Sequence, residues 1–326
     1  MGTKKKIVMV NTEGVGKSVE EAYLQRNGYT DYELIRIDSE DDEDFFQEAE
    51  DADGVIIVYA NMNEQAFSRL KKCKVLTTQC IGVNNIDLEA ATRHGVYVGN
   101  VPDYCIEEVA VHTVAMFLAC VRKIGIYDRS IRAGKWDVAV GGEVHRTKGK
   151  TYGLVSYGNI PKRIAELLQP FGIRVIAYDP YAKDSAFENG NAKRVDTLEE
   201  LLAESDYISI HTPLLDSTRH MIGKEQFEAM KDGVVIIATG RGGVVDEEAL
   251  KEAILSGKAA AAGIDVIEDE KGCNSVLKGL EQVIMTPHAA YYSEEALVEV
   301  REKAVSQILE VLEENKKPSY LVNRQQ

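Results

Sequence analysis

Three polar side chains stand at the ends of apolar runs of strand length. Arg241 follows the run 234–238 beside glycines, Glu270 closes an acidic cluster after the run 263–267, and His288 follows the run 283–286. A guanidinium can hold a carboxylate through a forked contact, and an imidazole can exchange a proton near neutral pH. Ligands of open parallel sheets bind at the carboxyl ends of the strands, so we expect these side chains at one sheet edge.

Each of these residues also has an ordinary structural interpretation. An arginine at a strand end is commonly a surface ion pair, a histidine after Thr-Pro is commonly a turn residue, and a terminal acid pair is commonly solvated. The occurrence of all three together favours a catalytic site over these structural roles. For the other histidines we expect structural roles: His94, His112, His145, His211 and His220.

The segment 152–179 has the layout of a dinucleotide-binding unit. A strand leads through a turn at Gly158 into a helix over 162–169, and a second strand ends in Asp179, 21 residues after Gly158. An acid at about this distance hydrogen-bonds the adenosine ribose in Rossmann units. A carboxylate would repel a 2′-phosphate, so the sequence favours NAD over NADP.

The glycine fingerprint of this unit is altered. Its three positions hold Ser156, Gly158 and Pro161. Gly158 still allows backbone amides, including those of Asn159 and Ile160, to approach a pyrophosphate at the start of the helix. Pro161 is tolerated in a first helical turn, and Ser156 could cap the helix. By itself this pattern also fits an ordinary α/β turn, and only its context favours a cofactor site.

Apolar runs of strand length recur along the chain and alternate with helical stretches. Many are apolar throughout, which indicates strands buried on both faces and hence parallel sheets covered by helices. We expect an α/β fold with strands over 7–10, 55–59, 75–78, 96–98, 152–157, 174–178, 207–210, 234–238, 263–267 and 283–286.

Two long amphipathic helices divide this pattern. We expect the first over 105–124 and the second over 293–315, with Ser293 as the cap of the second. We place domain crossings at the start of each helix. One domain then comprises 1–101 plus 292–326, and the other comprises 102–291.

Composition restricts the class of protein. The chain has 326 residues, 44% of them apolar and 28% charged, with a formal net charge of -15. Such a charge repels nucleic acid and anionic membranes, so we expect neither as a partner. Five scattered cysteines without a metal-ligand spacing suit a reducing compartment, and no apolar run approaches about 18 residues. We therefore expect a cytoplasmic protein without a metal site.

Residues 11–18 end like a phosphate-binding P-loop. That motif needs a glycine where Asn11 stands, so we set the interpretation aside. Ser18 with Glu21 fits a capping box that opens a helix after the first strand.

Together with further motifs, the segments of Arg241, Glu270 and His288 make the sequence resemble the D-isomer-specific 2-hydroxyacid dehydrogenase family over nearly its whole length. The strongest motifs, beside the arginine, acid and histidine segments, are Gly82-Val-Asn-Asn-Ile-Asp87, Asn100-Val-Pro-Asp-Tyr-Cys105 and Ser205-Asp-Tyr-Ile-Ser-Ile-His-Thr-Pro-Leu214. The resemblance is greatest to the branch of C-terminal-binding-protein-like and phosphoglycerate-dehydrogenase-like members. It implies two Rossmann-like domains with the active site in the cleft between them. Residues 1–101 plus 292–326 would form the flavodoxin-like substrate domain, and 102–291 the NAD-binding domain.

The resemblance also implies roles for the polar side chains. Arg241 would hold the carboxylate of a 2-keto acid and polarise its keto oxygen. His288 would exchange the proton of that oxygen, and Glu270 would keep His288 protonated for reduction. NAD would be bound by Gly158, Asn159, Ile160, Asp179, Thr212, Pro213, Thr218, Thr239 and Gly240, with Asp265 on the nicotinamide carboxamide. The substrate would meet Arg241, the amides of Ile81 and Gly82, and Tyr291.

Departures from the family narrow the substrate. Thr78 and Gln79 stand where many members carry an arginine for a phosphate or second carboxylate, so a non-phosphorylated 2-keto or D-2-hydroxy acid is favoured. Family members pair through the dinucleotide domain, which implies a homodimer with the helix 105–124 in the interface. The alternative is a non-catalytic NAD(H)-sensing partner protein, which the intact catalytic set disfavours.

Overall fold

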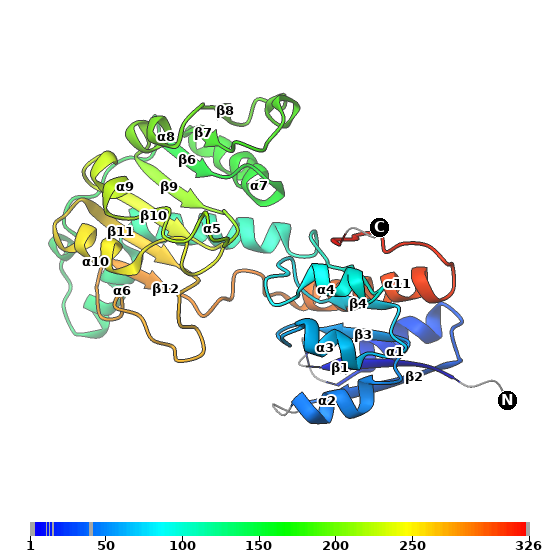
Figure 1. The fold of residues 1–326 in the computed structure, drawn as a ribbon. Coiled ribbons are helices and arrows are strands. Elements are labelled where there is room, and N and C mark those ends of the chain that lie inside the picture. Colours follow the sequence, from blue (N-terminus) through cyan, green and yellow to red (C-terminus); the bar gives the residue numbers. More distant parts are fainter. Residues whose placement is uncertain (1–3, 11, 13, 15, 39–41, 324–326) are drawn as a thin grey trace. The chain divides into compact units, whose positions relative to one another are not determined.

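The computed structural model describes residues 4–10, 12, 14, 16–38 and 42–323. The chain forms two compact units (Figure 1). Unit 1 comprises Met1–Cys105 with Tyr292–Gln326, and unit 2 comprises Ile106–Tyr291. The first crossing lies four residues beyond the position 102 that the sequence suggested, and the second lies at the same place.

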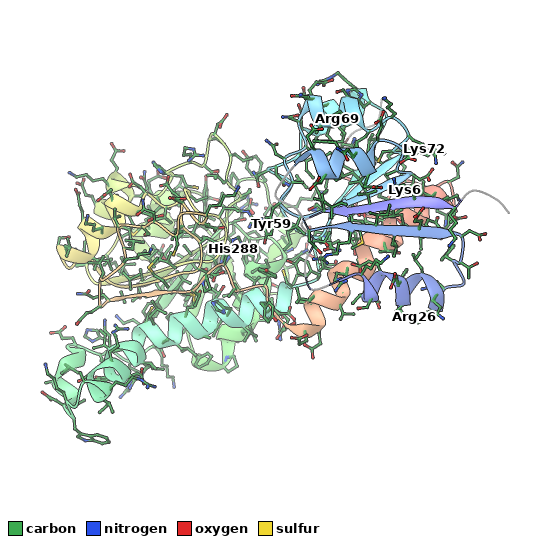
Figure 2. All side chains as sticks on the ribbon, turned by 90° about the horizontal axis from the view of Figure 1, so that it is seen from below. Lys6, Arg26, Tyr59, Arg69, Lys72 and His288 are labelled. Atoms are coloured by element: carbon green, nitrogen blue, oxygen red, sulfur yellow. The ribbon has the colours of Figure 1, made fainter. Side chains whose placement is uncertain are left out.

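Unit 1 has a five-stranded parallel sheet in the order β2-β1-β3-β4-β5. Its strands are β1 (Lys5–Val10), β2 (Tyr32–Ile37), β3 (Gly54–Ile57), β4 (Val75–Thr78) and β5 (Tyr97–Gly99). Its helices are α1 (Ser18–Arg26), α2 (Asp42–Ala49), α3 (Glu64–Arg69), α4 (Leu88–Arg93) and α11 (Glu294–Leu312). Helices cover both faces of this sheet: Figure 2 shows Arg26 of α1 and Arg69 of α3 on opposite sides of it.

Unit 2 has a seven-stranded parallel sheet in the order β12-β11-β10-β9-β6-β7-β8. Its strands are β6 (Thr151–Val155), β7 (Arg174–Tyr178), β8 (Lys193–Arg194), β9 (Tyr207–Ile210), β10 (Val234–Ala238), β11 (Ala259–Ile264) and β12 (Val283–Met285). Its helices are α5 (Ile106–Val121), α6 (Ile124–Arg132), α7 (Asn159–Leu168), α8 (Leu198–Glu204), α9 (Lys224–Ala229) and α10 (Glu247–Leu255). Short 3₁₀ turns lie at Val138–Gly141, Gln169–Phe171 and Asp184–Phe187.

The predicted α/β class with parallel sheets is confirmed. The central strands β6, β9 and β10 are buried along their whole length, as their unbroken apolar sequences indicated. The sequence reading missed β2, a sheet-edge strand whose polar and apolar residues are mixed, and β8, which has only two residues. Edge strands of this kind bury too little for a clear pattern.

The two long helices were placed correctly but not to the residue. The first ends at Val121 because Lys123 takes a left-handed backbone conformation (φ 56°), and the chain restarts as α6. The second is capped by Ser293, whose hydroxyl accepts the amide of Ala296 at 2.9 Å, as expected. In the described part of the chain no single helix could span a membrane, and α5 and α6 would qualify only as a pair bent by 63°.

The start of α1 tests the capping box that the sequence predicted after β1. Asn11, on which the P-loop argument turned, lies outside the described residues. The expected capping box is wrong, because Lys17 occupies the cap position and Ser18 is already helical. Lys17 donates to the carbonyl of Leu34 at 2.7 Å and pairs with Glu21 at 3.2 Å, so the lysine that a P-loop would turn toward phosphate is engaged elsewhere.

Candidate active site

His288 and Glu270 form a hydrogen-bonded pair in unit 2. Nδ1 of the imidazole lies 3.0 and 3.1 Å from the two carboxylate oxygens. A carboxylate only accepts, so Nδ1 carries the proton and Nε2 is the ring nitrogen left for proton exchange. The hydrogen bond from His288 holds the pKa of Glu270 below its ordinary 4.5, with the Arg241 charge helping and burial opposing. The pair is about one-third to one-half exposed, so a ligand can reach it.

The turn that presents His288 is built on Asp265. His288 itself has a left-handed backbone (φ 52°), and its amide donates to the carbonyl of Asp265 at 2.8 Å. The carboxylate of Asp265 accepts the Thr286 hydroxyl at 2.5 Å and the amides of Ala289 and Ala290 at 2.8 and 3.0 Å. Its side chain is fully buried. The structure thus gives Asp265 a part in shaping the turn, which the sequence reading had not foreseen.

Arg241 lies just beyond the end of β10. Its Nη1 donates to the carbonyl of Gly240 at 2.8 Å, and its charge acts on Glu270. The following glycine is required by packing, because a Cβ on Gly242 would lie 1.9 Å from the carbonyl oxygen of Ile267. This close approach brings the chain after β10 against the chain after β11. Arginine, acid and histidine therefore all belong to the carboxyl end of one sheet.

The dinucleotide unit contains a hollow of about 410 Å³ lined by Tyr157, Gly158, Lys162, Asp179, Tyr181, Ala182, Lys183, Ser185 and Ala186. Gly158 is the cap residue of α7, so the free amides of Asn159 and Ile160 start the helix. A Cβ built on Gly158 would meet nothing within 4 Å, which shows open space in front of this turn. The geometry suits a pyrophosphate at a helix N-terminus.

Ser156 does not cap α7, contrary to the expectation. It takes a left-handed conformation (φ 84°) in the turn, and its hydroxyl lies 3.4 Å from Asp179. The Asp179 carboxylate also accepts the amides of Tyr157, Tyr181 and Ala182 at 2.8, 2.9 and 3.1 Å. Asp179 therefore organises the turn in addition to facing the hollow.

The remaining expected residues fall in both units. Thr218 closes a turn by donating to the carbonyl of Pro213 at 2.6 Å, and Thr212 precedes that turn. Thr239 is buried with its hydroxyl 2.9 Å from that of Thr113. The Tyr291 ring packs edge-on to His288, with ring centroids 6.2 Å apart.

Ile81 and Gly82 follow β4 in unit 1, and the carbonyl of Ile81 accepts from Asn100 at 2.7 Å. Sequence reasoning missed Thr286, and it treated His112 as unrelated to the site. Among the described residues, no cluster of three His, Cys, Asp or Glu could hold a metal ion.

Comparison with known proteins agrees with this geometry. Residues 114–290 match the model described as D-isomer specific 2-hydroxyacid dehydrogenase, NAD binding domain. The hydroxypyruvate reductase of Thermotoga maritima is 39% identical over 74% of this chain and 78% of its own length. The D-3-phosphoglycerate dehydrogenase of Methanocaldococcus jannaschii is 36% identical over 83% of this chain, which spans only about half (52%) of that relative.

The fold agrees as well. The D-lactate dehydrogenase of Aquifex aeolicus, solved with NAD and lactic acid, superposes with a TM-score of 0.80 at 27% identity, covering 95% of this chain and 96% of that one. The family model covers more than half of the chain, and the reductase match spans most of both proteins. The chain therefore belongs to the D-isomer specific 2-hydroxyacid dehydrogenase family.

Proposed function

We propose that the protein is an NAD-dependent dehydrogenase that interconverts a 2-keto acid and a D-2-hydroxy acid. The observation that carries the proposal is the His288–Glu270 pair, at 3.0 Å, with Arg241 close enough to act on its carboxylate. These groups follow strands of the same sheet that carries the Gly158 turn and Asp179. The family's NAD binding domain covers them all.

The cofactor supplies or accepts a hydride at the substrate carbon. As negative charge develops on the keto oxygen, Nε2 of His288 donates a proton to it, and in the reverse direction the same nitrogen accepts it. Glu270 holds Nδ1 and so fixes the direction of the ring. Arg241 binds the substrate carboxylate through its planar fork. Asp179 accepts from the adenosine ribose, while the amides at the start of α7 receive the pyrophosphate.

The substrate that this chain suits is a non-phosphorylated one. Thr78 and Gln79 are buried rather than presented to a ligand. The Gln79 amide lies 3.3 Å from a carboxylate oxygen of Glu20, which is itself fully buried. A phosphate placed on this stretch would meet no arginine from it, and the nearby guanidinium of Arg301 is already held by Glu20 at 2.5 and 2.7 Å.

A panel of 2-keto acids with NADH, followed by absorbance, tests the proposal directly. His288→Ala should lower turnover by roughly 10²–10⁴-fold and leave NADH binding nearly intact. His94→Ala is the matched control, because that histidine pairs with Glu64 in unit 1. NADH binding without turnover of any keto acid would contradict the enzymatic proposal. Such a result would fit a non-catalytic NAD(H)-sensing protein instead.

We also propose that the protein is a homodimer that pairs through unit 2. The apolar side of α5, which motivated the expected interface, is buried within unit 2 itself. The nine residues of α6, all of them described, include none that is buried. Large apolar side chains are exposed on α6 and the segment after it: Ile124, Ile131, Trp136, Val138 and Val140.

The charge of this segment supports a second copy as the group that covers it. Residues 122–150 carry eight Lys and Arg against three Asp and Glu, in a chain of net charge -15. A basic, apolar segment is complementary to the acidic remainder of another copy. The proposed interface therefore shifts from α5 to α6 and the residues that follow it.

A further inference from the structure

The backbone of His288 is held in a conformation that it would not adopt freely. A left-handed φ of 52° is unfavourable for a non-glycine residue and persists only where the surroundings enforce it. The enforcing group is the buried carboxylate of Asp265, which takes three donors from residues 286–290. The direction of the His288 ring therefore depends on where this carboxylate sits.

Two side chains of α5 reach this arrangement: Met116, whose Sδ lies 3.8 Å from the Thr286 hydroxyl oxygen, and His112. Nε2 of His112, on α5, lies 3.1 Å from the hydroxyl oxygen of Thr286 and 3.8 Å from the nearer carboxylate oxygen of Asp265. The Thr286 hydroxyl already donates its proton to Asp265 at 2.5 Å. It can only accept from His112, so Nε2 of His112 must carry a hydrogen.

The bonds form a chain that runs from α5 to the His288 turn. His112 donates to Thr286, Thr286 donates to Asp265, and the Asp265 carboxylate also accepts the amides of Ala289 and Ala290. The imidazole of His112 is about one-quarter exposed, whereas the Asp265 side chain is fully buried. In such low-dielectric surroundings each bond polarises the next, and losing a donor leaves a buried acceptor less satisfied.

We infer that His112 is a positioning residue for His288, acting through Thr286 and Asp265. This rests on the proposed function, in which His288 exchanges the substrate proton. His112 does not touch the reacting atoms. Its imidazole holds the Thr286 hydroxyl, and that hydroxyl holds the Asp265 carboxylate around which the His288 turn is folded. His112 therefore sets where Nε2 of His288 points.

The next residue on α5, Thr113, contacts the end of a different strand. Thr113 places its hydroxyl 2.9 Å from that of Thr239, which follows β10 and lies two residues before Arg241. Adjacent positions of one helix therefore contact the end of β12 and the end of β10. Loss of His112 should therefore disturb proton exchange by His288. Arg241, which binds the substrate carboxylate, keeps its own support through Thr113 and Thr239.

The test compares His112→Leu, His112→Gln and the control His94→Leu, each with the best keto acid found and with NADH. His94 suits as a control because its side chain is exposed to a similar degree, 31% against 26%, and it lies in unit 1. We expect His112→Leu to lower kcat about 10- to 100-fold at saturating NADH, the scale of a misplaced catalytic group. His112→Gln keeps an N–H donor and should recover most of kcat.

The path through Thr286 is tested by a double-mutant cycle. Thr286→Val removes the same chain of bonds, so His112→Leu in that background should cost little more. Additive losses would overturn the inference, as would a His112→Leu kcat equal to that of His94→Leu or a failure of His112→Gln to recover activity. The proposed function is tested separately by His288→Ala: if that variant keeps full turnover the function itself fails, and if it loses turnover while His112→Leu does not, only the inference fails.

Discussion

The ion pair between Arg301 and Glu20 offers a sharp test of what stabilises unit 1. It joins α11 to α1 through bonds of 2.7 and 2.5 Å, and the two side chains are only 5% and 0% exposed. Arg301 also donates to the carbonyl of Gly16 at 2.9 Å. In the part of the chain that the structure describes, Arg301→Leu would leave the buried carboxylate with the amide of Gln79, at 3.3 Å.

An uncompensated buried charge of this kind costs about 3–5 kcal/mol. For a unit of this size that corresponds to a fall of roughly 10–20 °C in its unfolding midpoint. Replacing both partners with leucine removes the charge as well as the bonds. The Glu20→Leu/Arg301→Leu variant should therefore unfold within a few degrees of the parent.

A control exists on the same two helices. Arg26 of α1 pairs with Glu302 of α11 at 3.0 Å, but its side chain is 58% exposed, so Arg26→Leu should cost at most about 1 kcal/mol. Scanning calorimetry with and without NADH separates the units, because the cofactor raises the transition of the unit that binds it. If Arg301→Leu shifts the NADH-independent transition no more than Arg26→Leu does, the pair contributes nothing and our reasoning is wrong.

Four further outcomes can be checked. Asp179 should make kcat/KM higher with NADH than with NADPH, and Asp179→Ala should narrow that ratio; equal use of both cofactors by the parent would contradict the assignment. Because the hydrogen bond from His288 lowers the pKa of Glu270 below 4.5, the loss of keto-acid reduction that protonation of Glu270 causes should be centred below pH 4.5. In Glu270→Gln the protonated imidazole of His288 loses its carboxylate partner. As pH is raised, the reduction rate of this variant should therefore begin to fall earlier than that of the parent. Superimposable pH profiles of parent and variant would refute the pairing. Light scattering at micromolar protein should give a dimer mass, and Trp136→Glu should shift it toward the monomer, whereas a monomeric parent would end the dimer proposal.

The sequence by itself predicted the fold class, which is confirmed, and it supplied the candidate site residues that we propose. Strands such as β6 and β10 are apolar throughout because both of their faces are buried, and that pattern is local. Arg241 and His288 were predicted as site residues because each comes three residues after a strand, at the edge where parallel sheets bind their ligands. The cap at Ser293 was likewise local, since it satisfies an amide three residues away.

Only the tertiary structure decided how these residues are held. The partner of His112 is Thr286, 174 positions away, and the partner of Glu20 is Arg301, 281 positions away. Neither pairing leaves a periodic pattern in the sequence, because each depends on which helix packs beside which strand end. The same holds for the left-handed turn at His288 and for the bond between Ser156 and Asp179. Residue types and strand ends specify the chemistry locally, but buried hydrogen bonds between distant segments set its geometry, and these form only once the chain has folded.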